Sequence, residues 1–278
     1  MSERIPIGAA NAKSAEENSS KKTHFLERLD APATKAFNKL RTDIESGAIG
    51  SIIGIDGSGR VAALLAREVI RIVYEHKGLK SAQTRFFAGR ADWEAIREHL
   101  KDNPLEKDRK VLVVDDTLAT GNSVKPIIQA LDALGYQSEF LAIHGATYYD
   151  TISFERPEPD EELAATTLKA ADEALDRALA PDSNDEEREK ASQENMELYR
   201  RYSEEIVNVR IPLHGGSLED NSPLTNRSEL SGVEKQGGVW GSGIKTEGIH
   251  AVPYRSPEVP LVRKEVKELA EKITSSWI

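Results

Sequence analysis

The sequence predicts an α/β protein in which a parallel sheet is flanked by helices. Short apolar runs of strand length alternate with segments whose apolar residues recur at helical spacing. The apolar runs are continuous, as in strands that are covered on both faces. Turns containing Gly and Asp follow two of these runs. A chain of 278 residues is long enough to bury a sizeable core around such a sheet.

The first part of the chain is expected to lead into this core. Residues 1–22 are polar and read as a disordered lead-in. Apolar residues recur at helical spacing over residues 23–49, which predicts one or two helices that end near Gly47. A strand, a tight turn and a helix are then expected at residues 51–55, 56–59 and 61–74.

The same alternation continues to the end of the expected core, residues 23–150. Strands are predicted at residues 84–88, 111–114 and 140–144, with a helix at residues 93–100. Residues 115–122 are expected to form a turn. Ser123 is suited to cap a following helix that reaches Leu134 and ends at Gly135.

The remainder of the chain differs in composition. Residues 151–205 are predicted to form an acidic helical insertion, a solvated hairpin broken near Pro181. Residues 206–278 form a Gly-rich C-terminal extension that is available to complete the core. It contains an alternating strand pattern at residues 206–213, a loop rich in Gly and Ser at residues 215–248, and a helix pattern at residues 262–273.

Composition excludes several classes of function. The absence of cysteine removes disulfides, thiolate nucleophiles and Cys-based zinc sites. A formal net charge of -10 argues against a general nucleic-acid-binding surface. No apolar run approaches the roughly 20 residues that cross a bilayer. The first residues also lack the pattern of a secretory signal, so we expect a cytoplasmic protein without a membrane partner.

The segment Val111–Ser123 combines two features that suit a sugar phosphate. Asp115 and Asp116 follow a buried strand, and two such carboxylates accept hydrogen bonds from sugar hydroxyls or hold a hydrated Mg²⁺ through water. The following residues offer hydroxyls and backbone N–H groups at the start of a helix, where the helix dipole favours an anion. They are Ala119, Thr120, Gly121, Asn122 and Ser123.

This segment resembles the signature of the type I phosphoribosyltransferases, which transfer ribose 5-phosphate from phosphoribosyl pyrophosphate to a nitrogenous base. The resemblance implies a phosphoribosyltransferase-like fold over about residues 51–144, with Mg²⁺ as cofactor. It makes Asp115 and Asp116 the partners of the ribose hydroxyls and residues 119–123 the 5-phosphate cradle. Asn122 stands where a second glycine is usual, and asparagine tolerates the left-handed backbone better than most residues. The acceptor base is left open.

The resemblance also implies a pyrophosphate-binding loop and a basic loop over the active site. The loop after the first strand consists of Asp56, Gly57, Ser58, Gly59 and Arg60. Its glycines let backbone N–H groups approach phosphate oxygens, and Arg60 supplies positive charge. The candidates for the basic loop are Arg85, Arg90, Lys107, Arg109 and Lys110.

Other interpretations of these residues stay open. A non-catalytic module that senses phosphoribosyl pyrophosphate or a nucleotide would use the same contacts. Gly57, Gly59 and Ala62 also fit the dinucleotide fingerprint of an NAD(P)-dependent oxidoreductase, although no acidic residue follows the next strand at residues 88–90.

Single residues have plain structural interpretations as well. The aspartate pair is also typical of a turn or a helix start, and Asp56 of a helix cap. His144 is more typical of a structural histidine than of a general base. Tyr148 and Tyr149 suit the core or base stacking. The loop around Trp240 suits closure over substrate or contact with another subunit, so a homodimer is left open.

Overall fold

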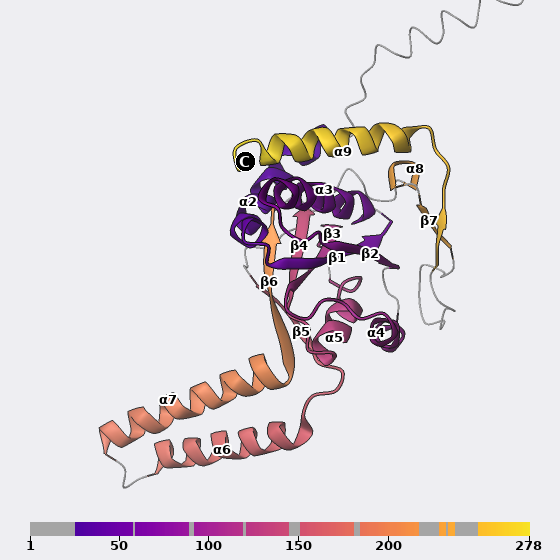
Figure 1. Cartoon of the computed structure of the whole chain (residues 1–278). Helices are drawn as coiled ribbons and strands as arrows, with labels where there is room; N and C mark the ends of the chain where they lie inside the picture. Colours follow the sequence, from indigo (N-terminus) through magenta and orange to yellow (C-terminus); the bar gives the residue numbers. More distant parts are fainter. Residues whose placement is uncertain are drawn as a thin grey trace, which may run out of the picture.

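The computed structural model describes residues 26–57, 59–88, 92–118, 121–144, 151–180, 184–216, 228–231, 233–236 and 250–278. Its centre is a six-stranded sheet of strand order β2-β1-β3-β4-β6-β5 (Figure 1). All neighbouring pairs are parallel except β5 and β6, which are antiparallel. The strands are β1 (Ile49–Asp56), β2 (Gln83–Ala88), β3 (Lys110–Thr117), β4 (Ser138–His144), β5 (Thr151–Glu155) and β6 (Asn208–Gly215). The expected α/β class with helices flanking the sheet is confirmed, and the sheet is mostly rather than entirely parallel.

Helices cover both faces of this sheet (Figure 1). One layer contains α2 (Asp30–Glu45), α3 (Gly59–Lys77) and α9 (Glu258–Thr274), and the short 3-10 helix η1 (Glu27–Leu29) precedes α2. The other layer contains α4 (Trp93–Asp102) and α5 (Lys125–Ala133). Two separate clusters of buried apolar side chains fill the two interfaces. All seven residues of β4 are buried, as the continuous apolar composition of a strand with two covered faces requires.

The connections reverse direction at β1. The chain passes from β1 through α3 to β2 on one side, and from β2 through α4 to β3 on the other side of β1. Because α3 and α5 lie on opposite faces, the segments that leave β1 and β3 diverge from each other. In open α/β sheets, ligands bind at such a topological switch point, outside the carboxyl ends of the strands.

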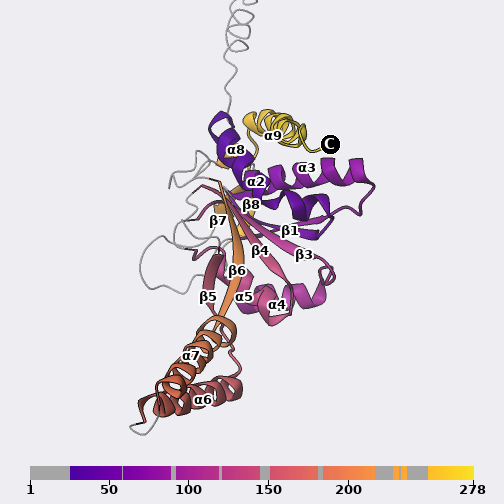
Figure 2. The same ribbon diagram turned by 90° about the vertical axis from the view of Figure 1, so that its left-hand side faces the viewer.

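A helical arm leaves the sheet between its two last strands (Figure 2). It consists of α6 (Glu161–Leu179) and α7 (Asp185–Arg201), followed by the π-helix η2 (Tyr202–Ile206). A capping box starts α7, because the side chain of Asn184 accepts from Glu187 N and the side chain of Glu187 accepts from Asn184 N. Glu155 of β5 pairs with Asn208 of β6, so the arm leaves at the amino-terminal end of β6. That edge of the sheet is opposite to the carboxyl ends of the parallel strands.

Three local expectations differ from the structure. The predicted turn at residues 115–122 is wrong in its first part, because β3 continues through Thr117. The helix expected to be capped by Ser123 begins at Lys125, and Val124 occupies its N-cap position. The segment expected to be an acidic helical insertion begins with strand β5, which the sequence analysis did not foresee.

The C-terminal part returns to the core. The alternating pattern at residues 206–213 corresponds to β6, and α9 packs on α3. Between them lie α8 (Ser228–Ser231) and a two-stranded antiparallel sheet of β7 (Val233–Gln236) and β8 (His250–Pro253). None of the described helices is long and apolar enough to span a bilayer.

Candidate functional site

The two loops with phosphate-binding composition follow adjacent strands of the sheet. Gly54 of β1 pairs in register with Val114 of β3, so the two strands end side by side. The loop containing Gly57 therefore lies beside the end of β3, at the switch point of the sheet. Two segments about 60 residues apart in sequence thus meet at one place.

The aspartate pair is part of strand β3. Consecutive residues of a strand point to opposite faces of the sheet, so the two carboxylates do not project in the same direction. Asp116 is only 1% exposed, and Thr117 Oγ1 lies 3.5 Å from its Oδ2. Asp115 is partly exposed, and its Oδ1 accepts a hydrogen bond of 2.9 Å from Asp116 N. A ligand that approaches the end of β3 meets Asp115 first.

Gly59 brings the first loop into contact with the aspartate pair. A Cβ atom at Gly59 would overlap Asp115 Oδ1 and lie 3.2 Å from Asp115 Cα. Gly57 has a φ of 101°, in the region that favours glycine. The two glycines therefore let the chain turn from β1 directly over the end of β3 and begin α3 there. The side chain of Asp56 and all of Ser58 lie outside the described residues.

The second loop turns just before α5. Gly121 has a φ of 72°, and its carbonyl accepts hydrogen bonds from Val124 N (3.0 Å) and Lys125 N (2.9 Å). Asn122 and Ser123 lie in this turn, whereas Ala119 and Thr120 lie outside the described residues. A Cβ at Gly121 would lie 2.9 Å from the ring of Phe154 in β5. The alternation of Ile152 and Phe154 was the signal that would have predicted this strand beside the loop.

Two helices begin at this edge of the sheet. The first residue of α3 is Gly59 and the first residue of α5 is Lys125. The N-terminus of a helix carries a partial positive charge and orients backbone N–H groups toward an anion. The guanidinium of Arg60 lies over the ring of Phe86, 4.2 Å from its centroid. This contact places Arg60 beside β2, next to the loop that contains Gly57.

The other basic candidates do not gather at this edge. Lys107, Arg109 and Lys110 precede or begin β3, so they belong to its amino-terminal end. Arg109 donates to the carbonyls of Gly47 (2.8 Å) and Ile49 (2.5 Å), which makes it a support for the start of β1. Arg85 donates to the carbonyls of Asn103 and Pro104. Arg90 lies outside the described residues, as do Tyr148, Tyr149 and Trp240.

His144 lies close to the aspartate pair in the sheet. It pairs in register with Thr117 and is 2% exposed. Its carbonyl accepts a hydrogen bond of 3.0 Å from Leu118 N. The buried position at the end of β4 agrees with a structural role for this residue.

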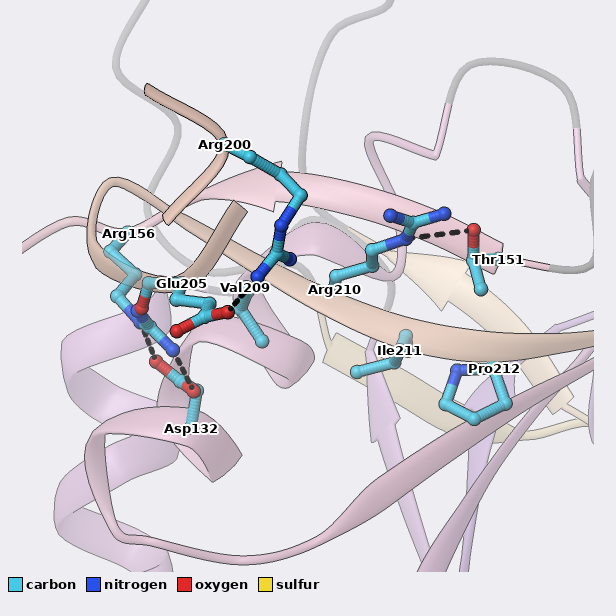
Figure 3. A pocket seen from close by; sticks show the side chains of 9 residues that line it. All are labelled: Asp132, Thr151, Arg156, Arg200, Glu205, Val209, Arg210, Ile211 and Pro212. Atoms are coloured by element: carbon cyan, nitrogen blue, oxygen red, sulfur yellow. Dashed lines mark hydrogen bonds and ion pairs between the residues drawn. The ribbon is translucent and has the colours of Figure 1, made fainter. Parts of the chain in front are cut away.

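A separate pocket of about 570 Å³ lies at the root of the arm (Figure 3). Arg156 forms two bonds with Asp132 of α5, of 2.6 and 3.1 Å, and donates to the carbonyls of Glu205 and Ile206. Arg200 pairs with Glu205 at 3.0 Å, and Arg210 Nε donates to Thr151 Oγ1 at 3.1 Å. These bonds join α5, β5, β6 and η2, so the pocket marks the anchor of the arm.

No known family model, curated protein or solved structure matches the chain.

Proposed function

We propose that this chain binds phosphoribosyl pyrophosphate with Mg²⁺ and transfers ribose 5-phosphate to or from a nitrogenous base. One observation supports this proposal above all. The glycine loop after β1 touches the carboxylate-bearing end of β3 at the switch point, through Gly59 and Asp115. A ligand with a sugar diol between two phosphate groups matches an edge that has carboxylates between two helix N-termini.

Each part of the ligand has a proposed partner. Asp115 receives the ribose hydroxyls, and Asp116 supports it from the buried side of the strand end. The 5-phosphate lies in the turn of Gly121, Asn122 and Ser123, with Ala119 and Thr120 completing the cradle. The pyrophosphate lies against the loop of Asp56, Gly57, Ser58, Gly59 and Arg60. The start of α5 stabilises the first anion and the start of α3 the second.

The donor set suits a magnesium ion that arrives with the ligand. No group of three or more metal-ligating side chains occurs among the described residues. Mg²⁺ commonly uses one or two carboxylates together with water and substrate phosphates. The partly exposed Asp115 would hold such an ion through water, while Asp116, which was expected to share this role, is buried and points to the other face of the strand. When bound, Mg²⁺ neutralises charge on the pyrophosphate.

The proposed chemistry depends on positioning and electrostatics. Charge develops on the pyrophosphate oxygens as the bond to the anomeric carbon breaks. We assign the stabilisation of that charge to backbone N–H groups at Gly57 and Gly59 and to the Arg60 guanidinium. The helix N-termini fix the two phosphate groups, so the anomeric carbon is presented beside Asp115. No covalent protein nucleophile is required.

A non-catalytic sensor of the same ligand is the second candidate. It is favoured by the burial of Asp116 and His144, because burial leaves Asp115 as the accessible titratable group of these three. The NAD(P)-dependent oxidoreductase has less support. Strand β2 ends at Ala88, and the nearby Asp92 carboxylate instead caps α4 by accepting from Glu94 N.

Binding is tested by thermal unfolding of the full chain with phosphoribosyl pyrophosphate and Mg²⁺. A ligand present at 100 times its dissociation constant stabilises a protein by about 2.7 kcal/mol. We expect a clear upward shift of the melting temperature with this pair and none with NAD or NADP. A shift with the dinucleotides alone would favour the oxidoreductase.

Variants then separate binding from turnover. Asp115→Asn combined with Asp116→Asn should remove both the thermal shift and any pyrophosphate release with a panel of bases. Asp108→Asn is the matched control, because Asp108 is exposed and precedes the amino-terminal end of β3. Binding without release, by wild-type protein and every base, would identify a sensor. An unchanged thermal shift in the double variant would refute the proposed site.

A further inference from the structure

The arm formed by α6 and α7 stands apart from the rest of the molecule. Both views show it extending away from the sheet and its covering helices (Figures 1 and 2). Its helices pack mainly against each other and against η2 at the root. The root is held by Arg156, which bonds to Asp132 of α5 (Figure 3). Arg156 also donates to the carbonyl of Ile206 in η2. The arm is thus a projection that is anchored at its root.

Small residues form the seam between its two helices. Thr167, Ala171, Ala174 and Ala191 are buried there. Asn195 Nδ2 crosses the seam and donates to Ala171 O at 2.7 Å. Small side chains let the two helices approach closely. The large apolar side chains of the arm are therefore little used in the contact between α6 and α7.

The remaining apolar side chains gather on one face. Successive residues of a helix are rotated by about 100°, so a residue that directly follows a seam residue lies on one flank. In antiparallel helices, these flanks belong to the same face of the pair. The bond from Tyr199 OH to Asp172 Oδ1, of 3.1 Å, confirms this for the arm. The resulting apolar face consists of Leu168, Leu175, Leu179, Met196 and Tyr199.

The opposite face has a different character. It carries Glu173, Arg177, Lys190, Glu194, Glu197 and Arg201. Arg177 and Glu194 pair across the two helices at 2.8 Å. The arm therefore has one charged side and one apolar side.

The apolar face is open to solvent. Leu179 is 72% exposed, Met196 61%, and Leu175 and Tyr199 39% each. Eight large hydrophobic side chains are exposed among the described residues, and five of them lie on the arm. Four of these five belong to the apolar face, and the fifth, Leu163, lies on the other flank. A contiguous patch of this kind indicates an interaction surface.

The small number of charged residues on the apolar face is compatible with a second copy of the chain as partner. Between the ends of the arm, the apolar face carries two charged residues. Asp172 accepts the Tyr199 hydroxyl, and Glu189, seven residues before Met196 on the same flank of α7, accepts a hydrogen bond of 3.3 Å from Gln193 Nε2. The other side chains of this face are uncharged, so like charges between two identical faces are limited to these two positions. A basic partner would instead favour a face with several acidic residues.

A second copy also fits in area. A helix of 19 residues such as α6 is roughly 28 Å long, and two adjacent helices are about 20 Å wide. Two arms that meet face to face would bury on the order of 1,100 Å² in total, which exceeds the roughly 1,000 Å² expected of a biological interface. We propose that the apolar faces of two arms join two copies of this chain as a two-fold symmetric four-helix bundle.

The dimer would leave the candidate site free. The arm leaves the sheet at the amino-terminal end of β6, whereas Asp115 and Gly59 lie at the opposite edge. The proposal is therefore independent of the proposed enzymatic function, and either one can fail alone.

Sedimentation of the full chain at about 1 to 100 µM tests the dimer. This concentration range suits an interface whose buried area is near the lower limit for a biological contact. We expect a species of twice the 30.7 kDa mass of one chain. Leu175→Glu with Met196→Glu should weaken association at least tenfold. The control, Thr166→Glu with Gln193→Glu, adds the same charge at exposed positions off the apolar face and should remain dimeric. Circular dichroism should show equal helicity in both variants.

A label then locates the contact. The chain contains no cysteine, so Met196→Cys and Gln193→Cys can each carry a single pyrene. We expect excimer emission from the label at position 196 and much less from that at position 193. A wild-type chain that stays monomeric, a dimer that survives Leu175→Glu with Met196→Glu, or a dimer without excimer at position 196 would each overturn the proposal.

Discussion

Gly59 is the residue at which fold and candidate site depend on each other. Its φ does not require glycine, but an added Cβ would overlap Asp115 Oδ1 and press on the backbone of β3. We expect Gly59→Ala to lower the free energy of unfolding by about 1 to 3 kcal/mol, as overpacking does. It should also reduce the thermal shift produced by phosphoribosyl pyrophosphate. Chemical denaturation with and without the ligand measures both effects.

Gly78→Ala is the comparison for this prediction. Gly78 has a φ of 67°, and a Cβ there would meet no atom within 4 Å. Its cost should come from backbone strain alone, about 1 kcal/mol, with no effect on ligand binding. If Gly59→Ala behaved in the same way, the close approach between the first loop and Asp115 would have no role in binding.

A buried carboxylate at the other end of the sheet gives a pH dependence. Glu139 accepts hydrogen bonds from Lys110 Nζ (2.6 Å) and His214 Nε2 (2.9 Å), and Lys110 also pairs with Asp43 of α2. Burial alone would raise the pKa of Glu139, but the bonds from His214 and Lys110 outweigh burial. The pKa is therefore below its ordinary value of 4.5. Stability from Glu139 is present above that value and is lost as the pH falls through the lowered pKa.

Replacing this carboxylate should change the acid response. Glu139→Gln should lower the free energy of unfolding at pH 7 by about 2 kcal/mol, because it removes hydrogen bonds to a charged group. It should also make the loss of stability below pH 4.5 shallower. Denaturation curves between pH 3 and 7 measure both, with the exposed Glu173→Gln as control. A slope equal to that of the wild-type protein would contradict the assignment.

At the scale of elements, strands and helices with strong local patterns were predictable. Strand β4 is buried on both faces, so its sequence is a continuous apolar run. Helix α3 is buried on one face, so its apolar residues recur at helical spacing. The end of β3 was not predictable, because Asp115 and Asp116 have turn propensity but are held in the strand by pairing with β4. Strand β5 has only the short alternation of Ile152 and Phe154 as a local signal, and its partner β6 is more than 50 residues away in sequence.

The candidate site was predictable only in part. Local composition indicated two loops that suit phosphates, and the strand order explains why they meet. Sequence spacing did not indicate that Gly59 touches Asp115 or that the aspartates point to different faces. It also did not separate Arg109 and Lys110 from the site, because only the strand direction places them at the other edge. These relations depend on tertiary packing.

At the scale of the molecule, the two C-terminal features contribute very differently to the core. Helix α9 buries Val262, Val266 and Ile273, and the turn after it buries Trp277, all in the same apolar cluster as α3. Burial of such side chains contributes about 1.5 to 3 kcal/mol each. Their summed contribution is therefore comparable to the whole free energy of unfolding of a typical domain. Among the described residues, α6 and α7 pack mainly against each other and against η2, and the root of the arm is held by polar bonds.

Removal of the arm should therefore leave the core folded. Arg156 N donates to Val207 O at 2.7 Å, so the chain enters and leaves the arm at adjacent points. Residues 158–205 can be replaced by a short Asn-Gly turn that joins Pro157 to Ile206. The exposed pair of Arg97 and Glu158 would be lost, at a cost of about 0 to 1 kcal/mol. We expect cooperative unfolding and an unchanged response to phosphoribosyl pyrophosphate, measured by thermal unfolding, but a monomer in sedimentation. A shortened chain that fails to unfold cooperatively would mean that the arm supports the core, since the deletion leaves the buried Ile206 and both sheet strands in place.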